Sequence, residues 1–131
     1  MTASLDLTAS RNLAWAPIID IFYTGDPLPL TGATAAMQIR LYPGATGAAL
    51  ASLSPVPFED MAPVAPDARR RIRLSPSIAK AALAAFPTGL NQPEPGEADV
   101  YSFDIIITYA DASQDKLALG SFILEPGVTT A

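Results

Sequence analysis

The chain lacks both cysteine and histidine. This absence excludes disulfides, thiolate chemistry, and zinc or haem ligation through these two residue types. It also excludes a Ser-His-Asp arrangement and leaves no side chain whose ordinary pKa lies between about 5 and 8. Acid–base catalysis would need a carboxylate or a lysine with a strongly shifted pKa. We therefore expect no enzyme, and no catalytic, cofactor-binding or metal-ligating residue.

Basic residues and long apolar runs are also scarce. The chain has 8 Lys and Arg against 13 Asp and Glu, a net charge of −5. Nucleic-acid binding requires a basic surface, so nucleic acid is not an expected partner. No apolar run approaches the roughly 20 residues that span a bilayer, and residues 1–10 do not resemble a secretory signal. We expect no membrane partner, and synthesis in the cytoplasm.

The residues that are present predict one mainly β domain over 1–131. Half of the chain is apolar and only 16% is charged, which is typical of a folded domain. The 13 prolines and 8 glycines favour short strands joined by turns. Alternating apolar residues predict about seven strands, at residues 5–7, 12–23, 33–42, 48–53, 69–74, 100–109 and 116–124. This pattern predicts an antiparallel immunoglobulin-like β-sandwich.

The segments between these strands are one helix, two long loops and a tail. Residues 75–86 predict a short α-helix, with Ser75 as its cap, Pro76 at its first position and Pro87 beyond its end. Residues 54–68 form a Pro-rich loop with a short extended piece around 56–60. Residues 87–98 form an acidic loop, and residues 127–131 form a C-terminal tail.

Two features predict an interface with other proteins. Pro17 lies inside the expected strand 12–23 and cannot donate a ladder hydrogen bond, so this strand is expected at an edge, with Ile18 and Phe22 as candidate contacts. The arginine run supplies Arg69, Arg71 and Arg73 on one face of the expected strand 69–74. These guanidinium groups either bind an acidic partner or charge a solvent face against edge pairing.

Carboxylates and aromatic residues leave two rival functions open. Asp20 and Asp104 lie inside apolar strands. They are either buried carboxylates, as the tuned acid or base of an enzyme would be, or strand residues that face water or bond to a neighbouring backbone group or arginine. Trp15, Tyr23, Tyr42 and Tyr101 are candidate stacking platforms of a carbohydrate- or receptor-binding module, or simply core residues. Denser carboxylates in the loops either bind calcium or face solvent; they are Glu59, Asp60, Glu94, Glu97 and Asp99.

Three segments in order resemble small bacteriophage tail proteins. Residues 23–40 (YTGDPLPLTGATAAMQIR) resemble the pattern D-G-x-P-x-D-L-T-G-x-T-A-x-M-Q-I-R. Residues 71–83 (RIRLSPSIAKAAL) resemble a strand followed by a helix that opens L-S-x-x-x-T-x-x-L. Residues 101–108 and 120–129 resemble the closing hairpin, Y-x-Y-D-L-x-x-T and G-x-F-x-V-x-P-x-V-T. The family often has Arg-Gly-Asp where this chain has Arg11-Asn-Leu, and its two long loops are shorter.

This likeness is to the N-terminal domain of phage baseplate upper proteins and covers most of residues 11–129. It implies an immunoglobulin-like fold, no catalytic residues, and a structural role in a phage or prophage tail or baseplate. It also implies other virion proteins as partners, with homo-oligomerisation as a further expectation, and a location in the virion.

Overall fold

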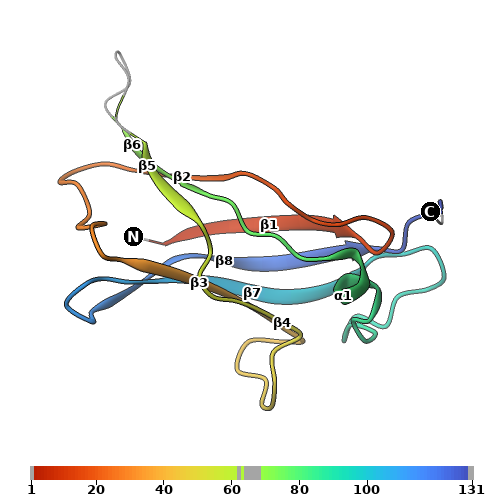
Figure 1. Cartoon of the computed structure of the whole chain (residues 1–131). Coiled ribbons are helices and arrows are strands. Elements are labelled where there is room, and N and C mark those ends of the chain that lie inside the picture. Colours follow the sequence, from red (N-terminus) through yellow and green to blue (C-terminus); the bar gives the residue numbers. More distant parts are fainter. Residues whose placement is uncertain (1, 62, 64–68, 130–131) are drawn as a thin grey trace.

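The computed structural model describes residues 2–61, 63 and 69–129. Within them the chain forms two facing β-sheets and one short helix (Figure 1). The larger sheet has the order β1 (Ala3–Ser10), β8 (Gln114–Glu125), β7 (Asp99–Thr108), β3 (Thr34–Arg40) and β4 (Ala51–Leu53). The smaller sheet has the order β2 (Ile19–Tyr23), β6 (Arg70–Leu74) and β5 (Phe58–Met61). The expected fold class, a mainly β two-sheet sandwich with one short helix, is confirmed.

The core lies between the inward faces of the two sheets. Alternation along β2, β3 and β7 turns one side chain in two toward it, as in Ile19, Ile21 and Tyr23 of β2. Trp15 meets the Phe122 ring edge-on, with ring centroids 5.1 Å apart. The strand alternation read from the sequence therefore identifies the buried face of β2, β3 and β7 correctly.

The described residues contain eight strands rather than seven, and one pair is parallel. The additional strand, β5, lies in the expected Pro-rich loop 54–68, near its extended piece; residues 62 and 64–68 of that loop lie outside the described residues. β1 runs parallel to β8, so the sandwich is not wholly antiparallel. The parallel pair arises because the chain leaves β1 for the other sheet instead of turning back beside it. β1 lies so close to Gly120 of β8 that a Cβ at this position would be 1.6 Å from the Leu5 carbonyl oxygen, so only glycine fits there.

The expected strand 12–23 is shorter in the structure. Only residues 19–23 belong to β2, and Trp15 forms an isolated antiparallel bridge with Ile78. Between the two, Pro17 has no N–H to donate, which agrees with a break in the ladder there.

The one short helix expected within residues 75–86 is confirmed, but it is shorter than expected, because α1 covers only Lys80–Ala84. The N–H and carbonyl of Ile78 both bond to Trp15, at 2.8 and 2.9 Å, and the Ser75 N–H donates to the Pro57 carbonyl at 2.9 Å. These long-range bonds hold residues 75–78 extended, so neither Ser75 nor Pro76 starts the helix. The helix begins after Ala79, whose side chain cannot cap it.

None of the helices in the described part of the chain is long and apolar enough to cross a membrane.

Candidate functional site

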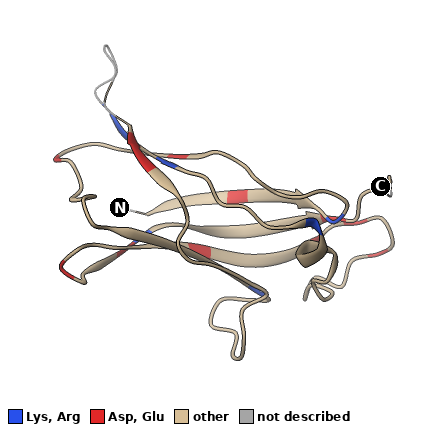
Figure 2. Ribbon diagram, in the orientation of Figure 1, with Lys and Arg blue, Asp and Glu red and all other residues tan. Residues whose placement is uncertain are grey.

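The predicted interface residues lie together on the outward face of the smaller sheet. The strand register places Phe22 opposite Arg71, and Asp20 opposite Arg73. Ile18 and Phe22 are 66% and 45% exposed. We call the group Ile18, Asp20, Phe22, Arg69, Arg71 and Arg73 the Phe22 face. Figure 2 shows basic and acidic residues side by side on β2 and β6.

The arginines of the Phe22 face hold its aromatic ring and its carboxylate. The guanidinium carbons of Arg69 and Arg71 lie 4.5 and 5.8 Å from the Phe22 ring centroid, within cation–π range. Arg73 donates to both Asp20 oxygens, at 2.9 and 3.3 Å, and Arg71 lies 3.6 Å from Oδ2. The hydrogen bond from Arg73 holds the pKa of Asp20 below its usual value. Asp20 is therefore an ion-paired strand residue and lacks the burial of a tuned acid.

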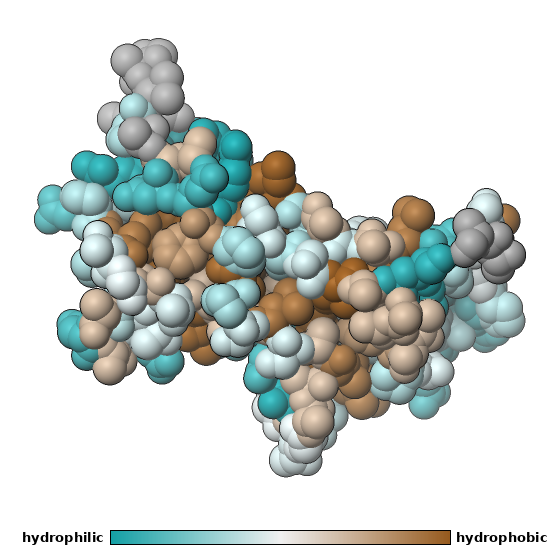
Figure 3. Space-filling model, in the orientation of Figure 1, coloured by the Kyte–Doolittle hydropathy of each residue, from teal (hydrophilic) through white to brown (hydrophobic). Residues whose placement is uncertain are grey.

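β2 is also an edge of its sheet. It pairs with β6 on one side, and no described strand lies on the other. The loss of a ladder partner at Pro17 and the exposure of Ile18 and Phe22 fall along this same edge. Figure 3 shows hydrophilic residues gathered over the end of the smaller sheet that carries β5 and β6. A strand that lacks a partner on one side and has exposed apolar side chains can bind a strand of another polypeptide.

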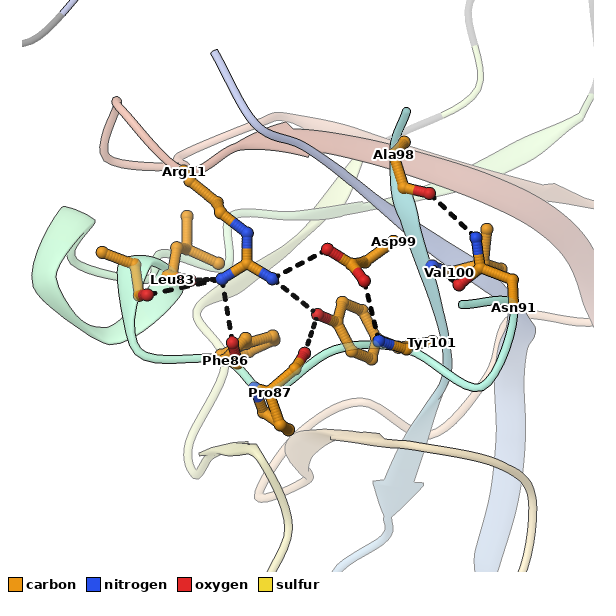
Figure 4. A network of polar contacts seen from close by, with 11 residues as sticks. Arg11, Leu83, Phe86, Pro87, Asn91, Ala98, Asp99, Val100 and Tyr101 are labelled. Atoms are coloured by element: carbon orange, nitrogen blue, oxygen red, sulfur yellow. Dashed lines mark hydrogen bonds and ion pairs between the residues drawn. The ribbon is translucent and has the colours of Figure 1, made fainter. Parts of the chain in front are cut away.

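Sequence reasoning missed the most connected polar side chain, Arg11 (Figure 4). Its Nη1 faces the carbonyls of Leu83, Ala84 and Phe86, at 3.2, 3.3 and 2.9 Å. Its Nη2 donates to the Asp99 carboxylate at 2.9 Å and to the Tyr101 hydroxyl at 3.0 Å. Burial is the main cause that raises the pKa of Tyr101. An isolated arginine after a strand gave no signal that it would reach α1 and β7.

Asp99 and its neighbours hold the acidic loop 87–98 against β7. The second oxygen of Asp99 accepts from the Gly89 N–H at 2.7 Å, and the Tyr101 hydroxyl donates to the Pro87 carbonyl at 2.5 Å. Asn91 exchanges two bonds with Ala98 and Val100, at 2.9 and 3.1 Å (Figure 4). These contacts make the Arg11–Asp99 pair a structural anchor between the segment after β1, the α1 region and the start of β7.

The carboxylates considered for calcium do not converge. No group of three or more carboxylates in the described ranges could hold a metal ion. Glu97 accepts from the Glu94 N–H at 2.9 Å, and Asp99 is bonded to Arg11. Glu97 therefore organises the backbone of its own loop, and Asp99, the first residue of β7, is held by Arg11.

Three of the four candidate aromatic platforms are core residues. Trp15, Tyr23 and Tyr101 are 7%, 8% and 1% exposed, whereas Tyr42 is 45% exposed. Tyr42 lies at a groove of about 550 Å³ on the larger sheet, whose lining also includes Asp104. The two candidate enzyme carboxylates thus lie on outward positions of different sheets, Asp20 on β2 and Asp104 on β7, and do not form a pair.

No family model and no curated protein sequence matches this chain.

Proposed function

We propose that this protein is a structural component of a phage or prophage tail or baseplate, and that it works by packing against other virion proteins. The observation that carries the packing role is the β2 edge. No described strand pairs with β2 on the side away from β6, and Ile18 and Phe22 are exposed there. The resemblance of residues 11–129 to baseplate upper proteins supports the assignment to a tail.

The Phe22 face supplies the contacts that such docking needs. Ile18 and Phe22 offer apolar surface to bury, at about 25 cal/mol per Å². The Asp20–Arg73 ion pair presents two charges in a defined geometry to a partner protein, which favours specificity over affinity. A strand of the partner could pair with β2 through main-chain hydrogen bonds, which would align it with these side chains. The partner is another virion protein, with a second copy of this chain as the homo-oligomeric case.

The test is recovery of the tagged protein from a lysate of induced host cells, with mass spectrometry of what accompanies it. Wild type is expected with tail proteins, whereas Ile18→Asp and Phe22→Asp lose them. Leu90→Asp is the matched control, because Leu90 is 60% exposed but lies in the loop 87–98. All three sites are exposed, and Phe22→Asp also removes the ring contacts with Arg69 and Arg71, so each variant is expected to fold within about 1–2 kcal/mol of wild type.

Recovery of the wild type alone, as a monomer, would contradict the proposal. Retention of tail proteins by both aspartate variants would show that another surface docks.

A further inference from the structure

The outward face of the larger sheet carries a groove that packing through β2 does not use. Strand register builds its floor in rows, with Gln38, Asp104 and Leu119 side by side on β3, β7 and β8. In the next row, Ser102 lies beside Ser121. The groove holds about 550 Å³, within the range of about 300–1,000 Å³ that is usual for small-ligand sites.

The groove joins apolar surface to short polar groups. Tyr42 and Leu119 line it and are 45% and 40% exposed, so a ligand can reach both. Ser102, Ser121 and Asp104 present hydroxyl and carboxylate oxygens between them. A ligand that fits must therefore have an apolar face as well as several hydrogen-bonding groups.

The basic groups in the groove already have hydrogen-bond or ion-pair partners within the protein. Arg40 donates through Nη1 to the Ala45 and Gly47 carbonyls, at 3.1 and 2.7 Å, and through Nη2 to Gln38 at 3.1 Å. Lys116 lies 3.5 Å from Asp104 Oδ2. An acidic ligand would have to compete with the Asp104 carboxylate for Lys116 and with three neutral oxygens for Arg40. A ligand without charge needs no such exchange.

We propose that this groove binds a neutral saccharide of one to three rings. A pyranose ring has an apolar C–H face that packs on the Tyr42 ring. The hydroxyl groups of the sugar both donate and accept hydrogen bonds, so they suit the hydroxyls of Ser102 and Ser121. They also suit Asp104 Oδ1, which accepts no hydrogen bond from the described residues. The volume limits the ligand to a short saccharide. This proposal stands on the β3–β7–β8 groove alone and does not depend on the β2 edge.

The test is titration of the ¹⁵N-labelled protein with four neutral probes, maltotriose, cellotriose, chitotriose and lactose, and with trigalacturonate as the acidic probe. At least one neutral probe is expected to shift the amide signals of residues 38–45, 102–106 and 116–121, and to saturate with a Kd of about 1 mM or tighter. Tyr42→Ala is expected to weaken this binding about tenfold, and Asp104→Asn to weaken it by a smaller factor.

Leu90→Ala is the matched control, because Leu90 is an exposed apolar residue, 60% exposed, that does not line the groove. It is expected to leave the saccharide Kd within about twofold. The spectrum of each variant without ligand shows whether the fold is intact. Four results would overturn the proposal: no groove shifts with any neutral probe at 10 mM, shifts with trigalacturonate only, unchanged binding by Tyr42→Ala, or groove shifts that appear on raising the protein concentration without sugar.

Discussion

Replacing Arg11 by methionine tests whether this one side chain joins the segment after β1 to α1 and β7. Methionine keeps the apolar stem but removes every donor. The substitution breaks the contacts to three carbonyls and to the Tyr101 hydroxyl, and leaves Asp99 bonded only to the Gly89 N–H among the described groups.

The expected cost follows from the exposure of the pair. A hydrogen bond to a charged group contributes about 1.5–3 kcal/mol, and breaking a fully buried ion pair costs about 3–5 kcal/mol. The side chains of Arg11 and Asp99 are 21% and 13% exposed, so water screens part of this interaction. We expect a loss of about 3 kcal/mol in the free energy of unfolding, a large part of the about 5–15 kcal/mol typical of a domain.

Urea unfolding measures this loss, with Trp15 fluorescence as the signal, because Trp15 is the single tryptophan and is 7% exposed. The matched control is Arg40→Met, whose guanidinium bonds to exposed loop carbonyls and whose loss is expected to cost under about 1 kcal/mol. Amide exchange in residues 79–91 should accelerate in Arg11→Met alone. If Arg11→Met loses no more stability than Arg40→Met, the anchoring role assigned to Arg11 is wrong.

Three further outcomes are expected. Gly120→Ala forces its Cβ against the β1 backbone, so amide exchange in residues 3–10 should accelerate and the free energy of unfolding should fall by about 3 kcal/mol. The control Gly44→Ala should cost about 1 kcal/mol, because its Cβ has nothing within 4 Å but its φ is 81°. Because Arg73 lowers the pKa of Asp20, the stabilisation is present above the unfolded pKa of about 3.9 and is lost as pH falls through the lower folded pKa. Asp20→Asn should therefore be less stable than wild type at pH 6 and should approach it at pH 2; a constant difference would contradict this. Burial raises the pKa of Tyr109 to about 12, so wild-type stability should fall as pH rises from about 10 to 12, and Tyr109→Phe should make that fall shallower in urea titrations.

The sequence was informative where one strand's own side chains decide its structure. Alternation in residues 100–109 identified β7 and its buried face, because the period of two follows from the pleat. Pro17 indicated a gap in the ladder, and the exposure of Ile18 and Phe22 agrees with it. These inferences need no knowledge of which strands are neighbours.

The sequence misled where distant backbone groups compete with local preference. Ser75 and Pro76 begin a good helix by composition, yet the Trp15 backbone bonds to Ile78 and keeps this segment extended. Similarly, Asp99 gave the sequence signal of a loop carboxylate, while its partner Arg11 lies 88 residues away. Helix propensity amounts to only tenths of a kcal/mol per residue, so a few long-range hydrogen bonds outweigh it.

The sequence by itself determined that the domain is mainly β, which side of most strands is buried, and that cysteine and histidine chemistry is absent. The tertiary structure alone decided that Arg69, Arg71 and Phe22 share one face, that Asp20 and Asp104 lie on different sheets, and that Tyr42 is the exposed aromatic beside a groove. The physical reason is that the alternation of a strand follows from its own backbone, whereas its neighbours and its register depend on how the whole chain packs.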